Sequence, residues 1–205
     1  MDIQVRKLAI DDSLSRVSKL IYETDNYIFP HFFGESTVQA KQILSCMIEK
    51  DTIYNRDNIF VAIVDGQIVG VTVIAPSPVT INVGAFFESF ECAGATSEID
   101  EAFQEIMKEY FIPMESHPDG YYIASLCVDE QYRGQGIASA MTEQIINEYY
   151  NQKDIYLDCL SDNERAITVY ESHGFEKLFE FSGFTGLTFY KMIRRANVKD
   201  LSEEI

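Results

Sequence analysis

The chain has 205 residues, of which 46% are hydrophobic and 24% are charged, a composition typical of a soluble globular protein and unlike that of a disordered or collagen-like chain. Sixteen Lys and Arg residues against 33 Asp and Glu residues give a formal net charge of −17. A negative field of this size repels phosphate backbones, so we expect no nucleic-acid partner, while cationic partners are mildly favoured. Many acidic proteins owe their charge to solubility alone, so the charge by itself identifies no ligand.

The cysteines and the first residues give the expected location. Cys46, Cys92, Cys127 and Cys159 form no CxxC pair and have no matched Cys/His spacing, so no metal site is expected. Cys127 and Cys159 lie in apolar runs and are expected to be buried free thiols, which indicates a reducing compartment. The N-terminus lacks a basic segment followed by an apolar one, and no apolar run reaches the ~20 residues that span a bilayer. We therefore expect a cytoplasmic protein without membrane contact.

The first fifty residues alternate between strand-like and helical patterns. Asp11 and Asp12 stand before a helical spacing of apolar residues and are expected to cap that helix. The elements expected here are a strand at 3–8, a helix at 14–21, an aromatic loop at 26–34 and a second helix at 38–48.

The next segment predicts a tight hairpin. Residues 59–64 and 67–75 are rich in β-branched residues, and Asp65-Gly66 between them is typical of a two-residue turn. From Pro76 to Gly120 prolines and glycines interrupt the pattern around one helical segment near 97–110. We interpret residues 76–120 as an insertion that is a lid over a binding site, an oligomer contact in a homodimer, or a plain structural insert.

The remaining residues return to regular elements. Ser161 and Glu164 form a capping box, and Gly174 is placed to end the helix that follows it. The expected elements are strands at 121–128, 155–160, 177–181 and 185–193, helices at 134–150 and 162–173, and a charged tail at 194–205.

Residues 126–138, LCVDEQYRGQGIA, carry the clearest functional signal. An apolar strand runs into a loop with Gly134 and Gly136 and then directly into a helix. Glycines let a loop turn sharply, so that several backbone N–H groups converge at a helix N-terminus, which favours phosphate. Arg133 adds a positive charge in an otherwise acidic chain. The segment therefore indicates a phosphate-bearing ligand.

Two other phosphate motifs fit less well. A Walker A loop needs Lys and then Ser or Thr after its last glycine, but Ile137 and Ala138 follow Gly136. The dinucleotide fingerprint GxGxxG is half present, with Ser139 at its third position and Asp158 about twenty residues further on. That fingerprint usually opens a domain, whereas here it follows a hairpin-containing half.

The loop and a second motif together resemble the GNAT superfamily of acetyl-CoA-dependent N-acetyltransferases. The family's Q/R-x-x-G-x-G/A pattern corresponds to residues 131–136, QYRGQG, and a downstream pattern to Asn163, Ala166, Tyr170, Gly174 and Phe175. The resemblance covers 3–75 and 121–193 in element order, with motifs at 126–175. Glu130 stands where members often carry Pro, and the insertion at 76–120 replaces a short connection.

The resemblance implies a role for each matching residue. The pantetheine arm and the thioester oxygen would meet the strand residues Leu126, Cys127 and Val128, and the pyrophosphate would meet the loop and helix start, which comprise Arg133, Gly134, Gln135, Gly136, Ile137 and Ala138. Asn163 would contact the pantetheine arm. Tyr170 would donate a proton to the departing thiolate, since a phenol has a higher pKa than a thiol.

On this resemblance we expect one domain over 1–193, an α/β fold with a mixed, largely antiparallel sheet flanked by helices and with an inserted helical segment. The expected activity is direct transfer of the acetyl group of acetyl-CoA to a primary amine. The acidic residues Glu88, Glu91, Glu98, Asp100 and Glu101 suggest a cationic acceptor. The proton-accepting base is left open among Glu115, His117, Asp119, His31 and water.

Two rival functions differ in class. A regulatory module could bind acyl-CoA without turnover, and a Tyr170→Phe change would then have no rate to reduce. A dinucleotide-dependent oxidoreductase would bind NAD and not coenzyme A, which a thermal-shift comparison of the two ligands would reveal.

Overall fold

The computed structural model describes residues 1–25, 29–33, 36–95, 118–147, 153–183 and 186–196. In chain order its elements are β1 Gln4–Lys7, α1 Leu14–Tyr22, α2 Phe29–Phe33, α3 Thr37–Ile48, η1 Arg56–Asn58, β2 Ile59–Val64, β3 Gln67–Ser77, α4 Val83–Cys92, β4 Gly120–Val128, η2 Glu130–Tyr132, α6 Ile137–Ile145, β5 Ile155–Leu160, α7 Glu164–Ser172, β6 Glu176–Ser182 and β7 Thr188–Arg194. The helix expected near 97–110 and most of the tail lie outside the described residues.

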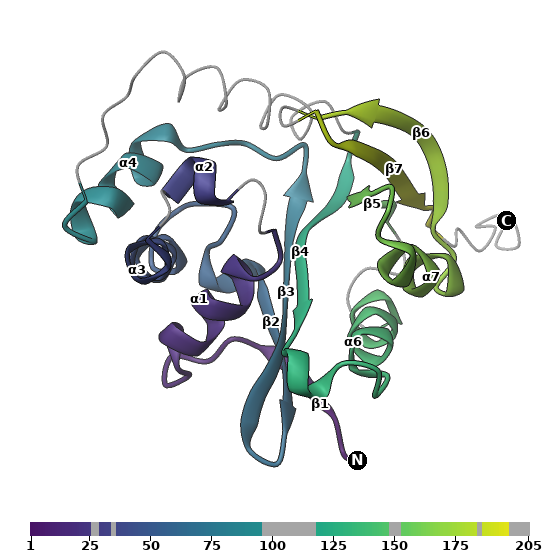
Figure 1. Cartoon of the computed structure of the whole chain (residues 1–205), viewed down its shortest axis with the longest axis horizontal. Helices are drawn as coiled ribbons and strands as arrows, with labels where there is room; N and C mark the ends of the chain where they lie inside the picture. The colour runs from purple at the N-terminus through teal and green to yellow at the C-terminus, as the bar shows by residue number, and fades with distance from the viewer. Residues whose placement is uncertain (26–28, 34–35, 96–117, 148–152, 184–185, 197–205) are drawn as a thin grey trace, which may run out of the picture.

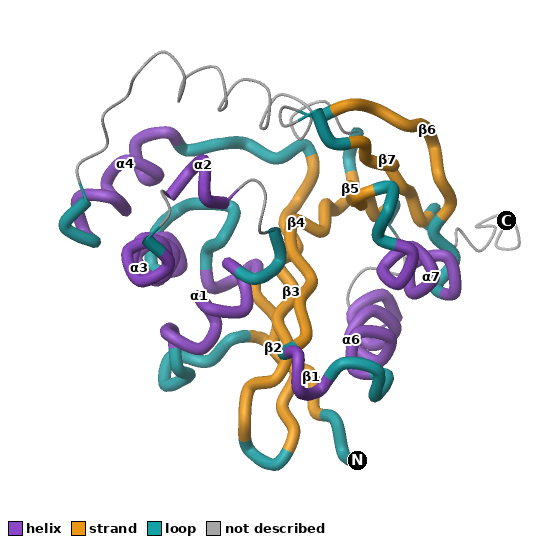
Figure 2. The backbone as a smooth tube through the Cα atoms, in the orientation of Figure 1, coloured by secondary structure: helices purple, strands orange, loops and turns teal. Residues whose placement is uncertain are grey.

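Over these residues the strands form one sheet in the order β1-β2-β3-β4-β5-β7-β6. β4 and β5 run parallel, and every other neighbouring pair is antiparallel. The expected mixed, largely antiparallel sheet is confirmed. The helices flank it on two sides, with α1, α2, α3 and α4 on one and α6 and α7 on the other (Figures 1 and 2).

Each face of the sheet has its own apolar core. One core joins α1, α2, α3 and α4 to the sheet, and the other joins α6 and α7 to it. β3 is buried from Ile68 to Ala75 without alternation, because a central strand covered on both faces needs apolar residues throughout. At the hairpin, Asp65 and Gly66 have φ of 49° and 76°, as a two-residue turn with two positive φ angles requires.

In α1 and α7 the N-cap is a residue nearer to the helix than the one expected from the sequence. Ser13, not Asp12, caps α1, and its Oγ accepts from the Arg16 N–H at 3.3 Å. Asp12 instead accepts hydrogen bonds from the Ala9 N–H at 2.7 Å and from the Arg6 guanidinium. Asn163, not Ser161, caps α7. The prediction of a loop at 26–34 was also wrong in part, because residues 29–33 form the short helix α2, whose aromatic rings are buried.

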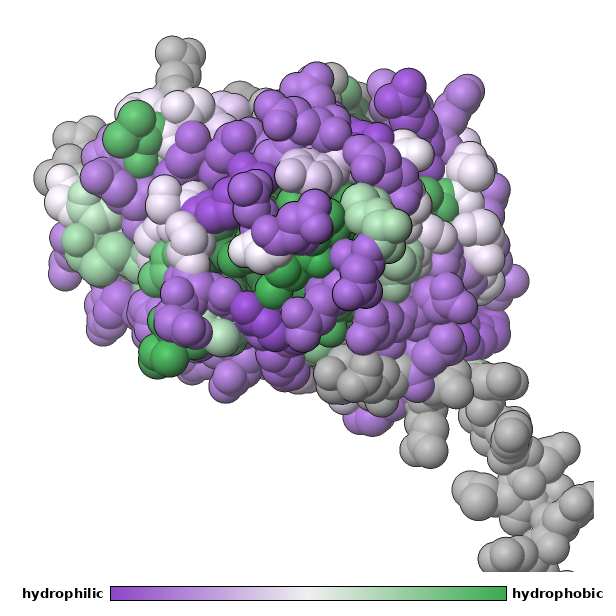
Figure 3. Space-filling view, turned by 90° about the horizontal axis from the view of Figure 1, so that it is seen from below, coloured by the Kyte–Doolittle hydropathy of each residue, from purple (hydrophilic) through white to green (hydrophobic). Residues whose placement is uncertain are grey.

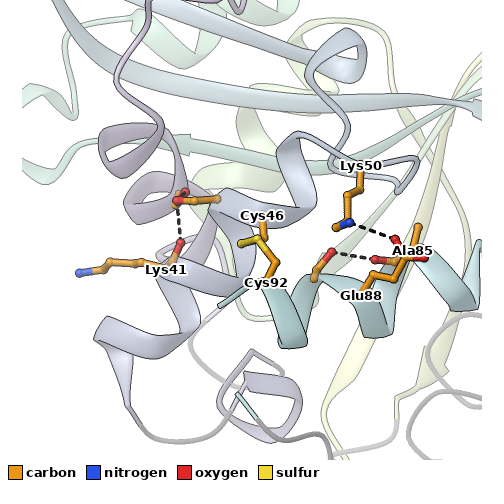
Figure 4. The surroundings of a disulfide bond; sticks show 9 residues. Lys41, Cys46, Lys50, Ala85, Glu88 and Cys92 are labelled. Carbon is orange, nitrogen blue, oxygen red and sulfur yellow. Dashed lines mark hydrogen bonds and ion pairs between the residues drawn. A yellow bond between two sulfur atoms is a disulfide. The ribbon is translucent and has the colours of Figure 1, made fainter. Parts of the chain in front are cut away.

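The helix α4 lies within the expected insertion and packs on α3. A disulfide between Cys46 and Cys92 joins the two helices (Figure 4). The Lys50 ammonium and the Glu88 carboxylate lie 3.0 Å apart alongside it. Cys127 and Cys159 are buried free thiols, as expected. Since the chain holds both redox forms of cysteine, the two thiols alone do not indicate a reducing compartment.

No helix in the described part of the chain combines the length and the apolar character that crossing a bilayer requires. Within the same residues, no group of three or more His, Cys, Asp and Glu side chains is arranged to hold a metal ion.

Candidate functional site

The neighbouring strands β4 and β5 separate part-way along their length. Their parallel pairing covers only Tyr121–Ile123 on β4 and Ile155–Leu157 on β5. Just beyond, the pairing of β4 with β3 skips Ala124, which makes a β-bulge in β4. A bulge bends and twists its strand, so it accounts for the turn of β4 away from β5 at this point. In Figure 1 the two strands diverge from there. Figure 3 shows the molecule from below, where hydrophobic residues gather near the middle of the face and hydrophilic residues surround them.

The divergence leaves one edge of β4 without a strand partner. From the bulge to Val128, β4 stays paired with β3, while β5 pairs with β7 up to Leu160. The described residues supply no strand that pairs with the other edge of β4 over 124–128. An extended ligand can add to such an edge as a further strand, through hydrogen bonds with the main chain. Leu126, Cys127 and Val128 lie on this segment.

The thiols near the divergence are protonated at neutral pH. Cys127 is 6% exposed, and burial raises the pKa of its thiol to about 11, although the nearby Arg133 opposes the shift. Burial, together with the negative charge of Asp158, raises the pKa of Cys159 to about 12. Because the thiolate is the nucleophilic form of cysteine, neither residue is suited to carry a covalent intermediate.

Beyond β4 the chain makes the turn that the glycines predicted. Gly134 and Gly136 have φ of 74° and 80°, in the left-handed region that glycine adopts most readily. A Cβ on either one would meet no atom within 4 Å, so the backbone conformation and not crowding requires glycine here. Gly136 is the N-cap of α6 and has no side chain to satisfy the helix amides.

The turn presents backbone donors to solvent. The first hydrogen bond of α6 runs from the Ala140 N–H to the Gly136 carbonyl at 2.9 Å. In the described structure no protein acceptor faces the N–H groups from Gly134 to Ser139. Residues 133–136 are exposed, whereas Ile137 is buried and anchors the helix start in the core. Unsatisfied amides at the positive end of a helix dipole form a site suited to phosphate.

Arg16 and Arg133 bind this loop to neighbouring elements through hydrogen bonds and an ion pair. Arg133 donates from Nε to the Val128 carbonyl at 2.9 Å, which holds its guanidinium beside the end of β4. Arg16 on α1 contacts Asp129 at 2.7 Å and also donates to the Ile68 carbonyl at 2.8 Å. The Gln131 N–H and the Arg16 guanidinium hold the pKa of Asp129 below its ordinary value. The loop is thus fixed to both β3 and α1.

The downstream motif has a structural explanation in the end of α7. The Phe175 N–H bonds to the Tyr170 carbonyl at 3.1 Å, and the Gly174 N–H to the Glu171 carbonyl at 3.1 Å. Gly174 has φ of 81°, and the Tyr170 and Phe175 rings pack with centroids 5.5 Å apart. These are the two hydrogen bonds and the apolar contact of a Schellman motif. Gly174 therefore ends the helix as predicted.

The motif also places two expected functional residues. Tyr170 is 8% exposed on the α6–α7 side of the sheet, where burial raises the pKa of its phenol. A phenol with a raised pKa stays protonated at neutral pH, so its hydroxyl is available as a hydrogen-bond donor. Asn163 uses its side-chain oxygen to accept from the Ala166 N–H at 3.2 Å, which leaves its amide nitrogen for a ligand.

The other expected residues are placed as follows. Ser139, the third position of the half-fingerprint, lies 3.2 Å from His173 Nε2, and Asp158 is paired with Lys191. Asp119 lies 3.2 Å from Lys153 and is largely exposed. Glu115, His117 and the His31 side chain lie outside the described residues.

Sequence reasoning missed a polar cluster at the divergence. Asp158 on β5 faces Lys191 on β7, with Asp158 Oδ1 2.7 Å from Lys191 Nζ, and the Tyr122 hydroxyl on β4 donates to Asp158 Oδ2 at 3.0 Å. The three positions are 33 to 69 residues apart in the chain, so no local motif joins them. The available signal was a polar residue in the middle of each of two apolar strands, Asp158 in β5 and Lys191 in β7.

Comparisons with known proteins bear on the family and the fold. The family model described as "Acetyltransferase (GNAT) family" matches residues 21–175. This chain belongs to the GNAT acetyltransferase family. The match begins in the last turn of α1 and contains the hairpin, the diverging strands, the glycine loop and α7.

Similar proteins agree with this family assignment. N-alpha-acetyltransferase 30 of Schizosaccharomyces pombe is 41% identical over 56 residues, or 26% of this chain. The curated matches span 17% and 37% of the two relatives' own lengths. An N-acetyltransferase of Staphylococcus aureus Mu50 superposes with a TM-score of 0.70 at 17% identity, over 93% of this chain and 99% of that one. The structure of the NatC complex bound to Gag peptide and CoA superposes with a TM-score of 0.54 at 16% identity, over 95% of this chain and 99% of that one. At these identities the structures show the shared GNAT fold.

Proposed function

We propose that the protein is an acetyl-CoA-dependent N-acetyltransferase that transfers the acetyl group directly to a primary amine in a ternary complex. One observation carries the proposal: the open β4 edge leads without interruption into the loop of exposed amides. The edge suits an extended amide-containing arm, and the amides suit phosphates. Coenzyme A joins these two chemistries in one molecule. The family uses acetyl-CoA, and a neighbour of the same fold was crystallised with CoA.

In this proposal each side of the divergence has a task. The N–H groups from Gly134 to Ala138 and the Arg133 guanidinium hold the pyrophosphate. Residues 126–128 align the pantetheine arm, and the Asn163 amide adds a donor to it. Bound acetyl-CoA supplies the thioester that the amine attacks. The protonated Tyr170 phenol supplies the proton for the departing thiolate.

Direct attack is favoured over a covalent enzyme intermediate. Transfer through a cysteine needs a thiolate, and the raised pKa of both free thiols keeps Cys127 and Cys159 protonated. The attacking group is then the neutral amine of the acceptor. For this step the amine must lose a proton before or during attack.

A cationic acceptor fits the charges near the open edge. Glu23 caps the C-terminus of α1, and its charge is close enough to contribute to the raised pKa of Cys127 on β4. Asp25, two residues later, likewise contributes to the raised pKa of Tyr54. Glu88 is paired with Lys50, so it contributes less, and Glu98 to Glu101 lie outside the described residues. Among the described residues, the end of α1 therefore adds acidic groups beside the open edge.

A transfer assay tests the proposal. The protein is incubated with acetyl-CoA and a panel of amines comprising spermidine, lysine, tyramine and short peptides with free N-termini, and released thiol is measured. We expect amine-dependent release, fastest with polycations at low salt. Equal turnover of neutral and cationic amines would contradict the cationic preference. Binding of acetyl-CoA with no release for any amine would instead support a non-catalytic acyl-CoA module.

A further inference from the structure

The pair Asp158 and Lys191 lies at the apex of the divergence. Leu157 is the last β5 residue paired with β4, and Asp158 follows it. Asp158 and Lys191 are register partners on β5 and β7, and Lys191 Nζ is 2.7 Å from Asp158 Oδ1 and 2.9 Å from Oδ2. The Tyr122 hydroxyl reaches the same carboxylate from β4. All three strands that meet at the apex therefore contribute to the cluster.

The cluster faces the α1–α4 side of the sheet. Its strand neighbours Leu157 and Cys159 belong to the α6–α7 core, and alternation along β5 places Asp158 on the opposite face. Tyr122 belongs to the α1–α4 core, which agrees with this placement. Tyr170 lies in the α6–α7 core. The carboxylate and the phenol thus flank the diverging strands from opposite faces.

The charged pair of Asp158 and Lys191 is buried, and a contribution to stability does not explain this burial. Lys191 is 4% exposed, and the Asp158 side chain is 17% exposed. Removing two charges from water costs several kcal/mol per ion, and well-packed apolar residues would stabilise such a position about as well. Asp158 Oδ1 is buried against the Lys191 ammonium. The remaining 17% exposure of the Asp158 side chain is the part through which another donor can approach the carboxylate.

The charged and titratable groups around Asp158 set its protonation. Burial raises the pKa of the carboxyl, while Lys191 and the Tyr122 hydroxyl oppose the shift. Burial lowers the pKa of the Lys191 ammonium, and Asp158 opposes that shift. The Cys159 thiol, the next residue on β5, is protonated. Lys191 also lies over the rings of Tyr122 and Phe181, with centroid distances of 5.8 and 5.4 Å.

We propose that Asp158 accepts the proton of the acceptor ammonium and that Lys191, assisted by Tyr122, is the positioning residue that keeps Asp158 ionised and aimed at the apex. This inference rests on the proposed function and names its base. The ammonium N–H proton passes to Asp158, and the freed lone pair forms the C–N bond at the thioester carbonyl. The C–S bond then breaks and the thiolate takes a proton from Tyr170. The amide nitrogen gives up its second proton, through solvent, to the Tyr170 phenolate, and Asp158 releases its proton to solvent before the next turnover. No oxidant or further reactant is needed.

The test is the pH dependence of kcat/KM, with acetyl-CoA and the best amine of the panel. We expect an acidic limb in the wild type and, for Asp158→Asn, loss of kcat of about 100-fold or more. Lys191→Met removes the charge that lowers the pKa of Asp158, so its limb should move to higher pH. Tyr122→Phe removes only one hydroxyl and should move the limb the same way by less. Asp158→Glu should restore part of the rate.

The matched control is Asp12→Asn. Asp12 is also a largely buried carboxylate in an ion pair, with Arg6, but it lies between β1 and α1, away from the divergence. Loss of the Asp12 carboxylate should leave the acidic limb of the kcat/KM profile unchanged. The double variant Asp158→Asn/Lys191→Met separates a structural role from the proposed one, because it removes both charges together. We expect it to recover the melting temperature lost in the single variants but not the rate.

Each outcome decides the inference. Recovery of rate in the double variant, or an acidic limb that stays in place in Lys191→Met and Tyr122→Phe, would overturn it while leaving the proposed function intact. If Lys191→Met does not fold, Tyr122→Phe alone decides by the position of the limb. If the wild type binds acetyl-CoA and releases no thiol with any amine of the panel, the proposed function fails and this inference fails with it.

Discussion

On the α6–α7 side of the sheet, the groups suited to a ligand are backbone amides from one contiguous segment, residues 126–138. On the α1–α4 side, they are side chains that three separate strands bring together: Tyr122, Asp158 and Lys191. The first arrangement needs two glycines and a helix start, and short-range sequence encodes both. The second exists only once β5 has paired with β7 and parted from β4. The comparison teaches that local sequence sets the groups proposed to bind acetyl-CoA, whereas the groups proposed to act on the acceptor come together only in the tertiary fold.

The largest expected effect falls on the rate and not on binding. Tyr170→Phe removes the proposed proton donor, so kcat should fall by about 100-fold or more. Acetyl-CoA affinity, measured by titration calorimetry, should stay the same because the amides that hold the phosphates are untouched. Tyr190→Phe, which removes a hydroxyl from another tyrosine against the same core, is the control. An unchanged kcat in Tyr170→Phe would assign the phenol a packing role only.

The disulfide tests whether the two sides are energetically separate. Cys46 and Cys92 are 46 residues apart, and the chain-entropy account gives a bridge of this span about 2–4 kcal/mol of the free energy of unfolding. Cys46→Ser should therefore lower the melting temperature, and dithiothreitol should do the same to the wild type, since Cys92 is exposed. Acetyl-CoA affinity should not change in folded protein. Insensitivity of the melting temperature to reductant would contradict this account.

The glycine loop tests the local side. Gly136→Ala places a Cβ on a left-handed residue, which costs about 1–2 kcal/mol. If the loop responds by leaving this conformation, acetyl-CoA affinity should fall by about tenfold, which corresponds to ~1.4 kcal/mol. Gly84→Ala in α4, where φ is not positive, is the control and should bind normally. Equal affinity in the two variants would show that the loop amides do not hold the ligand.

The smallest expected effect is on the free energy of unfolding, from substitution of Asp12 just before the N-cap of α1. The Arg6 hydrogen bonds, with that of the Ala9 N–H, hold the pKa of Asp12 below its ordinary value. A carboxyl with a lowered folded-state pKa stabilises the fold above its unfolded pKa of about 3.9, and this stability is lost as pH falls through the folded pKa. Asp12→Asn should cost about 1 kcal/mol or less at pH 7. In urea unfolding, a difference from wild type that grows as the pH falls would contradict this assignment.

The sequence was sufficient where periodicity and turn chemistry act over short distances. The hairpin at Asp65-Gly66, the turn at Gly134 and Gly136 and the helix end at Gly174 each follow from a few neighbouring residues. The family resemblance rested on the same segments and is confirmed. The caps at Ser13 and Asn163 were assigned to the wrong neighbour, because several side chains near each helix start are able to accept the same N–H groups.

The rest needed contacts between distant parts of the chain. The bulge at Ala124 depends on the register with β3, which no single-strand pattern displays. The pairing of Cys46 with Cys92 follows from the packing of α4 on α3, and α4 itself was not anticipated within the insertion. Asp158 fitted the spacing of a dinucleotide fingerprint, yet its carboxylate pairs with Lys191. Spacing alone did not distinguish these two environments.

The central claim is that the open edge of β4 and the amides of residues 134–139 form one site for acetyl-CoA. Isothermal titration of the wild type with acetyl-CoA, with NAD as the parallel ligand and Gly136→Ala as the matched variant, tests it most directly. The account predicts saturable binding of acetyl-CoA, about tenfold weaker in the variant, and no binding of NAD. Absence of acetyl-CoA binding, or binding of NAD in its place, would contradict it.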